Sequence, residues 1–170
     1  MIHKFQEKTP VVDGASYIAW NAEVIGDVVL EEETSIWYSA TIRGDIDSIR
    51  IGWGTNVQDN AALHVDEGVP LRIGRSVTIG HGAIVHGCIV GDGVLIGMGA
   101  ILLNRSQVGD HSIVGAGALV TEGKKFPARS LIVGAPARAV RQVTEEEIER
   151  IEENARNYRE RAKLHREATR

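Results

Sequence analysis

Large apolar residues recur every six positions through most of the chain. From Val12 to Ile132 the step is six residues, except for steps of nine, ten and five residues that lead to Ile51, Ile73 and Val90. A smaller residue follows most of these anchors at a distance of four positions. A helix would repeat every 3.6 residues and a plain strand every two, so the pattern fits neither. It predicts a parallel β-helix in which each hexapeptide forms one short strand and one corner.

The repeat also predicts the size and the interior of this β-helix. Three hexapeptides make one triangular coil, so about 20 hexapeptides predict about six to seven coils, which stack at ~4.8 Å into a prism ~30 Å tall. The anchors are expected to fill the prism. The 19 glycines suit its corners, where the backbone needs positive φ or close approach. Aromatic residues make up only 5% of the chain, which fits a narrow interior.

A charged segment replaces the repeat near the C-terminus. We expect residues 1–142 to form the β-helix domain, and residues 143–170 to form one amphipathic helix packed on it or on a neighbouring subunit. Thr144 and Glu147 have the spacing of a capping box at the start of this helix. The residues that follow at helical spacing are Ile148, Ile151, Ala155, Tyr158, Ala162 and His165. The predicted fold class is therefore mainly β, a β-helix of hexapeptide repeats with one C-terminal α-helix.

Composition narrows the classes of function. A chain of 170 residues predicts one domain, and a net charge of −4 provides no basic field for nucleic acid. No segment is apolar for long enough to span a membrane, and Met1–Pro10 lacks the apolar core of a signal peptide. We therefore expect a soluble, cytoplasmic protein. Cys88 is the only cysteine and occupies a small-residue position, so we expect it to be a buried packing thiol.

Two histidines are expected to stack on one edge of the coil. His64 and His86 each follow an anchor, and those anchors are three hexapeptides apart, which is one full coil. The side chains should therefore lie about 5 Å apart, the spacing of neighbouring strands. By the same count, Arg43 lies one coil below His64. His3, His111 and His165 fall outside these columns, and we expect His111 and His165 to be structural or solvated.

A third histidine falls on the preceding face. His81 is expected directly above Asp59 and beside Gln58. Zinc needs each imidazole nitrogen at about 2.0–2.1 Å, whereas five residues of extended chain separate His81 from His86 by roughly 15 Å. A three-histidine metal site therefore requires His81 of another subunit, which a homotrimer would supply. The same packing would pair Arg43 of one subunit with Asp59 of the next. The alternative is a set of hydrogen-bonded interface histidines without metal.

These motifs resemble the γ-class carbonic anhydrase family. The resemblance rests on IRGDIDSIRIGWGTNVQDNAALHVDE and IGHGAIVHGCIVGDGVLIGMGAILL, and it extends to VGAPARAVR and the final helix. It implies a left-handed β-helix and a homotrimer. It also implies that His64 and His86 of one subunit and His81 of another bind zinc, with iron(II) or cobalt(II) as alternatives.

The resemblance further implies an activity and roles for other residues. The expected reaction is reversible hydration of CO2 to bicarbonate by metal-bound hydroxide at the subunit interfaces. Three neutral imidazoles leave zinc dipositive, which lowers the pKa of bound water to about 7. Asp45 would lie near the pair of Arg43 and Asp59. Gln58, positioned by Asn56, would hydrogen-bond the metal-bound water or hydroxide.

The route of proton export is less clearly marked in the sequence. The best-known type of family member carries a long acidic loop after the first histidine, with a glutamate as proton shuttle, whereas this chain has only HVDEGVPLRIG. Glu67 or Asp66 is a candidate substitute, and a solvated loop carboxylate is the alternative. A low activity is compatible with this short loop. The resemblance also makes Tyr158, on one helix face with Asn154, a candidate for the pocket rim.

Three other functions remain open at this stage. A hexapeptide acyltransferase that uses acyl-CoA would share the coil and the trimer but would need a single catalytic histidine. A metal-dependent thioesterase would use the same metal site. A non-catalytic metal-binding or scaffold homologue would have no turnover. Three histidines at metal-ligand positions favour carbonic anhydrase over the acyltransferase.

Overall fold

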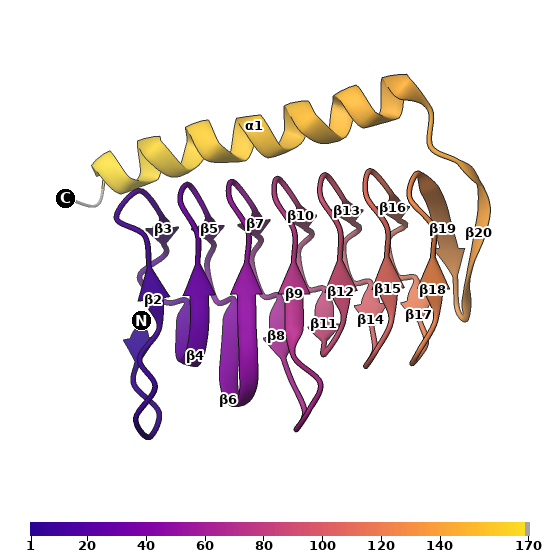
Figure 1. Ribbon diagram of the computed structural model, residues 1–170. Helices are drawn as coiled ribbons and strands as arrows, with labels where there is room; N and C mark the ends of the chain where they lie inside the picture. Colours follow the sequence, from indigo (N-terminus) through magenta and orange to yellow (C-terminus); the bar gives the residue numbers. More distant parts are fainter. Residues whose placement is uncertain (169–170) are drawn as a thin grey trace.

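The computed structural model describes residues 1–168 as a coil of short strands with one long helix laid along it (Figure 1). The predicted fold class is confirmed: the chain is mainly β, a left-handed parallel β-helix with one C-terminal helix. The predicted C-terminal segment includes residues 169 and 170, which lie outside the described residues.

Two sheets form the three faces of the prism. The first sheet covers two faces, because its order β17-β14-β11-β8-β6-β9-β12-β15-β18 passes through the long strand β6 at the corner. Its strands are β1 (Ile2–His3), β2 (Val11–Val12), β4 (Glu23–Leu30), β6 (Thr41–Ile51), β8 (Ala62–His64), β9 (Leu71–Ile73), β11 (Ile84–His86), β12 (Ile89–Val90), β14 (Ile101–Leu102), β15 (Gln107–Val108), β17 (Leu119–Val120) and β18 (Lys125–Phe126).

The second sheet forms the third face. Its strands are β3 (Tyr17–Ile18), β5 (Ser35–Ile36), β7 (Asn56–Val57), β10 (Thr78–Ile79), β13 (Leu95–Ile96), β16 (Ile113–Val114), β19 (Ser130–Gly134) and β20 (Ala137–Gln142). All of its pairings are parallel except the last, in which β20 runs antiparallel to β19. The chain therefore leaves the coil through a hairpin, which the six-residue pattern did not predict.

The apolar anchors fill the prism as predicted. Every anchor from Val24 to Ile132 is buried, and only Val12 and Ile18, in the first coil, are half-buried. Anchors stack on anchors, since Val57 pairs with Ile79. The small-residue positions are also interior, and Cys88 is buried among them, where desolvation raises the pKa of its thiol to about 12.

Glycine is needed where neighbouring coils touch at a corner. A Cβ atom added to Gly97 would lie only 2.5 Å from the backbone nitrogen of Ala116 in the next coil. Gly14 has no heavy atom within 4 Å of the same position. The six-residue repeat therefore depends on glycine at particular corners and not at every turn.

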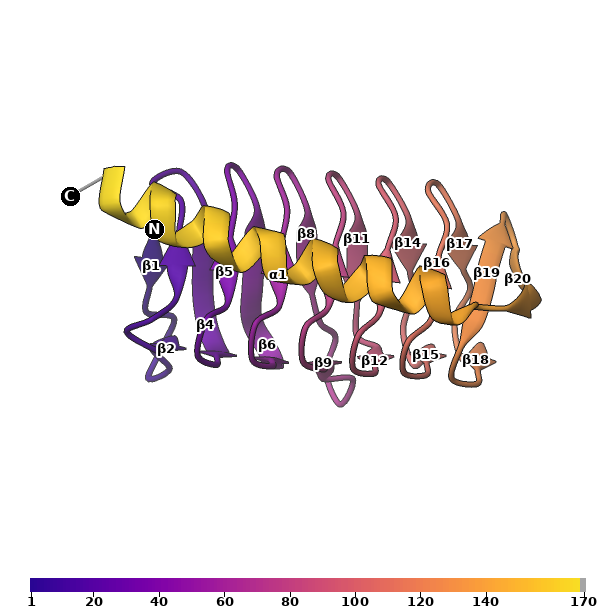
Figure 2. The same cartoon turned by 90° about the horizontal axis from the view of Figure 1, so that it is seen from above.

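The helix α1 (Glu145–Ala168) begins with the predicted capping box and packs on the β-helix of its own chain. The backbone N–H of Glu147 donates to the Thr144 hydroxyl at 3.2 Å, and that of Thr144 donates to the Glu147 carboxylate at 2.9 Å. Ile148, Ile151 and Ala155 are buried beneath the helix. Figure 2 shows α1 crossing the coils from β19 back to the N-terminal end. Across residues 1–168, no helix combines the length and apolar composition needed to cross a lipid bilayer.

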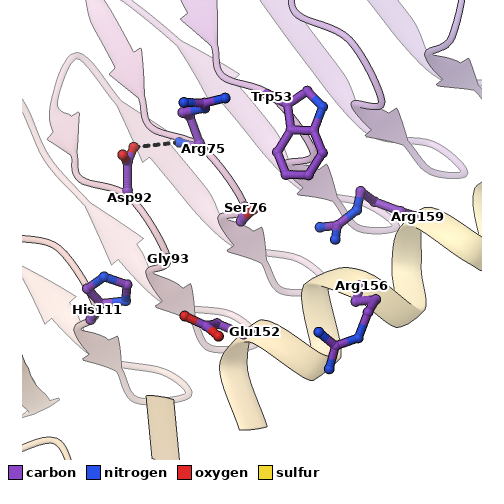
Figure 3. A pocket seen from close by; sticks show the side chains of 9 residues that line it. All are labelled: Trp53, Arg75, Ser76, Asp92, Gly93, His111, Glu152, Arg156 and Arg159. Carbon is purple, nitrogen blue, oxygen red and sulfur yellow. Dashed lines mark hydrogen bonds between the residues drawn. The ribbon is translucent and has the colours of Figure 1, made fainter. Parts of the chain in front are cut away.

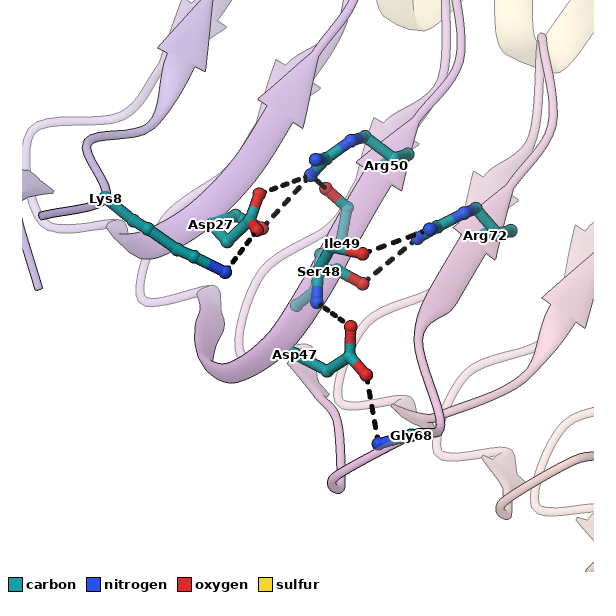
Figure 4. Close-up of polar contacts among 8 residues, drawn as sticks. All are labelled: Lys8, Asp27, Asp47, Ser48, Ile49, Arg50, Gly68 and Arg72. Atoms are coloured by element: carbon teal, nitrogen blue, oxygen red, sulfur yellow. Dashed lines mark hydrogen bonds and ion pairs between the residues drawn. The ribbon is translucent and has the colours of Figure 1, made fainter.

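Two loops protrude where the sequence steps are nine and ten residues long: the first is the bend inside the long strand β6, and the second joins β8 to β9. Asp47 joins them, because its carboxylate accepts hydrogen bonds from the backbone N–H groups of Ser48 at 2.6 Å and Gly68 at 3.0 Å (Figure 4). Arg72 donates to the backbone oxygen of Ser48 at 3.1 Å. The same figure shows Asp27 between Lys8 and Arg50 in the coils below. The two loops are therefore fixed against each other, and both supply residues to the site described next.

Candidate metal centre

His64 and His86 stack at the ends of β8 and β11, as the register predicts. They are direct partners in the parallel pairing of these strands, and their ring centroids are 5.0 Å apart. Nδ1 of His64 lies 3.0 Å from Nε2 of His86. Two nitrogen ligands of a tetrahedral zinc ion are about 3.3 Å apart, given bonds of 2.0–2.1 Å. The pair is therefore close to the geometry in which two imidazoles share one cation.

The other ring nitrogen of each histidine is within hydrogen-bond distance of a side-chain oxygen. Nε2 of His64 is 3.0 Å from a carboxylate oxygen of Asp45, and Nδ1 of His86 is 2.6 Å from the side-chain oxygen of Asn104. These oxygens only accept, so each favours a protonated nitrogen opposite it. The two nitrogens that face each other are then left with lone pairs, as metal ligation requires.

Both acceptors are held in place by further contacts. Asp45, in the first protruding loop, also accepts a hydrogen bond from Arg43. Burial alone would raise the pKa of Asp45, but the hydrogen bonds from His64 and Arg43 outweigh it and hold that pKa below its ordinary value. The Asn104 side-chain N–H donates to Asp66, in the second loop, at 2.7 Å.

Asn104 is a site residue that the sequence reasoning missed. Val85 pairs with Leu102 one coil above, so Asn104, two positions after Leu102, lies next to His86. The count of hexapeptides that predicted the positions of the histidines could therefore have predicted that Asn104 lies next to His86.

His81 lies on the other face, beyond the end of β10. Its Nδ1 is 2.9 Å from a carboxylate oxygen of Asp59, the residue predicted beneath it. The imidazole is 43% exposed, and its Nε2 forms no hydrogen bond or ion pair with a residue from 1 to 168. Within residues 1–168, no three His, Cys, Asp or Glu side chains of one chain come together as a metal site.

A cavity of about 420 Å³ opens beside His81. Gln58, Asn154 and Tyr158 contribute polar groups to its wall, and the apolar remainder includes Ile96 and Met98. Polar and apolar groups therefore meet next to a partly exposed imidazole.

A chain of buried hydrogen bonds fixes Gln58. Its side-chain N–H donates to the Asn56 oxygen at 3.1 Å, and Asn56 donates to the Thr78 hydroxyl at 2.9 Å. Asn154, from α1, donates to the same hydroxyl at 3.3 Å. One of the two amide N–H groups of Gln58 is used in this way, and its side-chain oxygen is the group that can accept a hydrogen bond.

Tyr158 occupies the border between the aromatic packing and the cavity. Its ring meets Trp37 edge-on, with centroids 5.4 Å apart. Burial raises the pKa of Tyr158 above its ordinary value, and the nearby charge of Arg161 opposes this only in part. The phenol therefore stays protonated at neutral pH.

Other candidate residues lie apart from the stacked pair. Glu67 is exposed in the turn between Asp66 and Val69, and it makes no hydrogen bond or ion pair with another described residue. Asp59 contacts His81, and Arg43 contacts Asp45, so the predicted pair of Arg43 and Asp59 between subunits stays a prediction.

The remaining histidines have local structural contacts. His3 lies 2.5 Å from Glu23, and His165 lies 3.0 Å from the Tyr38 hydroxyl. His111 is packed beneath Gly93 in a coil corner. Neither His3 nor His111 forms a hydrogen bond or ion pair with the stacked pair in residues 1–168.

Comparisons with known proteins identify the family. Residues 87–122 match the model for the bacterial transferase hexapeptide (six repeats). The Geobacillus kaustophilus protein named carbonic anhydrase is 43% identical over 165 residues, covering 97% of this chain and 91% of that protein. "Gamma carbonic anhydrase 1, mitochondrial" of Arabidopsis thaliana is 44% identical over 165 residues, covering 94% of this chain. The chain belongs to the γ-class carbonic anhydrase family.

Family membership implies a metal cofactor, and the donor set of His64 and His86 fits one. The chain spans 60% of the length of that Arabidopsis relative. Among solved structures, a Bacillus cereus protein named as a candidate acetyltransferase has a TM-score of 0.96 and 37% identity, covering 98% of this chain and 97% of that one. The fold is therefore shared by proteins that carry the names of two different activities.

Proposed function

We propose that this protein is a carbonic anhydrase that reversibly hydrates CO2 to bicarbonate at metal sites shared between the subunits of a homotrimer. One observation carries the proposal. Each of the three histidines has one ring nitrogen on a side-chain oxygen: Asp45 for His64, Asn104 for His86 and Asp59 for His81. Such acceptors are the usual outer partners of metal-binding imidazoles, because they fix the tautomer and the ring orientation.

In this proposal, His64 and His86 of one subunit and His81 of another hold Zn²⁺, with Fe²⁺ or Co²⁺ as alternatives. The bound cation would supply the Lewis acidity that makes water a nucleophile at neutral pH. Arg43 and Asp59 would pair across the same interface. His81 suits a shared site because its side chain is partly exposed and its Nε2 has no partner among residues 1–168.

The residues around the cavity have separate roles in this proposal. The Gln58 oxygen accepts a hydrogen bond from the reacting water and orients it, and the hydrogen bond from one Gln58 amide N–H to Asn56 fixes the direction of the side chain. The protonated hydroxyl of Tyr158 is a hydrogen-bond donor at the rim of this cavity. The apolar wall, including Ile96 and Met98, accommodates CO2, which has no net charge or dipole.

Glu67 is the proposed acceptor that passes the proton to solvent. Its exposed turn gives it access to buffer, and Asp66 beside it is already engaged by Asn104. The cytoplasmic location expected from the sequence stays a prediction.

Stopped-flow CO2 hydration on anaerobically purified, metal-quantified protein tests the proposal. We expect about one metal ion per subunit and measurable hydration. His64→Ala and His81→Ala chains should each be inactive, and a mixture of the two should regain part of the activity, because mixed trimers contain interfaces with all three histidines. A fully metallated trimer without hydration would overturn the proposed activity and favour a thioesterase or a scaffold.

An acyl-CoA-dependent acyltransferase is the second candidate. The acetyltransferase name of the Bacillus cereus structure supports it, since that protein is similar along nearly the whole chain. Acyl transfer by a single histidine base would need no metal. Activity towards acetyl-CoA that survives complete metal removal would favour this candidate over the carbonic anhydrase.

A further inference from the structure

Three buried polar side chains occupy a position of the hexapeptide that is apolar in the next two coils. In β5, β7 and β10 the residues before the anchors are Ser35, Asn56 and Thr78, and each is buried. In β13 and β16 the same position holds Leu95 and Ile113. A buried amide or hydroxyl costs free energy unless it is hydrogen-bonded. The contacts of these three groups therefore indicate why polar residues occupy this position.

The contacts of Asn56 set the orientation of its amide. Its Nδ2 donates to the Thr78 hydroxyl at 2.9 Å and to the backbone oxygen of Val77 at 3.4 Å, and this backbone oxygen can only accept. The Asn56 side-chain oxygen therefore faces Gln58 and accepts from its Nε2 at 3.1 Å. In this arrangement the Gln58 oxygen is the group available to the cavity, whereas a reversed amide would present a donor there. The direction of Gln58 thus depends on how Asn56 is held.

Thr78 joins this network to α1. The Asn154 side-chain N–H donates to the Thr78 hydroxyl at 3.3 Å, although the two residues are 76 positions apart in the sequence. The same hydroxyl thus accepts one amide from the β-helix and one from the helix. Thr78 and Asn154 both line the cavity beside His81, as Gln58 does. The Thr78 hydroxyl is therefore the point at which the Gln58 network meets α1.

Other contacts hold α1 on the β-helix. The helix buries an apolar stripe against the coils. Its other flank borders a second cavity, of about 380 Å³, which it forms with the coil corners at Trp53 and Arg75 (Figure 3). On this flank Arg159 lies over the Trp53 ring, 4.6 Å from its centroid. The helix is thus held without the contact between Asn154 and Thr78, and the effect of that contact lies in the Gln58 network.

We propose that Thr78 is a positioning residue for the reaction. It acts through Asn56 to direct the Gln58 oxygen at the reacting water, and through Asn154 it makes this direction depend on α1. The proposal rests on the proposed carbonic anhydrase function. A group that orients a nucleophile accelerates the reaction only while it is held in the productive geometry. Loss of the Thr78 hydroxyl should therefore lower the rate and leave the histidine ligands in place.

Thr78→Val tests this role, because valine has the shape of threonine and lacks the hydroxyl. We expect kcat for CO2 hydration to fall by about 10-fold, with KM and the zinc content unchanged. Thr78→Ser keeps the hydroxyl and should retain most of kcat. Thr34→Val is the matched control and should leave kcat unchanged. The buried Thr34 hydroxyl contacts that of Ser16 at 2.9 Å, two coils below Thr78.

A double-mutant cycle separates this role from a merely structural one. In a Gln58→Ala chain, Thr78→Val should lower the remaining kcat no further, because both changes remove the same orienting oxygen. An equal loss in both backgrounds would overturn the proposal, since Thr78 would then act without Gln58. A kcat for Thr78→Ser as low as that of Thr78→Val would also overturn it, because the hydroxyl would not be the group that matters.

NMR of the full-length protein tests the positioning without any turnover. The side-chain amide resonances of Gln58 are assigned by their loss in Gln58→Ala. We expect them to shift, and to exchange with solvent several-fold faster, in Thr78→Val and in Asn154→Ala, and to stay unchanged in Thr34→Val. Unchanged resonances in Thr78→Val or in Asn154→Ala would overturn the proposal. A lack of hydration by the unmodified protein would instead overturn the carbonic anhydrase function, so the two failures are distinguishable.

Discussion

The side-chain oxygen of Asn104 lies 2.6 Å from Nδ1 of His86. Asn104 belongs to the coil above His86, and its amide N–H is held by Asp66 in a protruding loop. This relationship orients the His86 ring so that Nε2 faces His64. The Asn104 amide, which would not itself be a metal ligand, would thus determine whether His64 and His86 can bind a metal ion together.

We expect Asn104→Ala to lower the affinity for zinc by about 10–100-fold, the usual effect of losing an outer partner of a metal-binding histidine. Competition with a chromophoric chelator measures the affinity. The exchange of Asn104→Asp together with Asp66→Asn is the matched control, because it keeps an oxygen opposite His86 and an amide-to-carboxylate contact between positions 104 and 66, and it should retain most of the affinity. Equal zinc affinities in the alanine variant and the unmodified protein would contradict the proposed role.

Tyr158→Phe should separate the rim hydroxyl from the aromatic packing. The ring contact with Trp37 is retained, so we expect the thermal midpoint and the zinc content to stay unchanged. The loss of one hydrogen-bond donor should lower kcat for CO2 hydration by roughly 2–10-fold. If kcat is unchanged while the protein is fully metallated, the hydroxyl has no part in the reaction.

Gly97→Ala should disturb the stacking of two coils. The added Cβ would meet the backbone nitrogen of Ala116 at 2.5 Å, and a backbone atom cannot move aside as a side chain can. We expect a loss of about 1–3 kcal/mol in the free energy of unfolding, as measured by urea titration. Gly14→Ala, where nothing lies within 4 Å, should change it by less than ~1 kcal/mol. Similar values for the two variants would refute the steric explanation.

The start of α1 should make stability depend on pH. The hydrogen bond from Arg141, together with the backbone N–H of Thr144, lowers the pKa of Glu147 from 4.5 to about 2. A lowered pKa contributes stability that is present above pH 4.5 and is lost as the pH falls towards 2. Glu147→Gln should therefore be less stable than the unmodified protein at pH 6, and the difference should shrink between pH 4.5 and 2.

Urea unfolding at several pH values measures this difference. Glu149→Gln is the control, because Glu149 is exposed and forms no ion pair among residues 1–168. A difference for Glu147→Gln that stays constant from pH 6 to pH 2 would mean that the charge of Glu147 contributes nothing to folding.

The repeat made the backbone predictable, because one register fixes every strand. The anchors, the interior cysteine and the stacking of His64 on His86 all follow from counting hexapeptides. The conformations of the two protruding loops could not be predicted in this way, because a step of nine or ten residues gives the length of a loop and not its path. Asp45 and Asp66 reach the site only through those paths.

The six-residue pattern also does not predict the directions of the side chains at the corners. A corner residue can point along the coil, across it or into solvent, and the hexapeptide count does not distinguish these directions. The count places Arg75 and Trp53 at corners, but it does not show that α1 passes over them and forms a cavity with them. Their common cavity depends on α1, which lies far from them in the sequence.

The path of α1 has a consequence for how the molecule comes apart. In a stack of coils each coil touches only its neighbours, so an unsupported stack can fray from either end. Here the helix leaves the last coil and returns to the first, where Arg166 donates to the backbone oxygen of Gly14 at 3.2 Å. Both ends of the stack therefore contact one helix, and we expect this helix to make the unfolding of the end coils more cooperative than it would be in an unsupported stack.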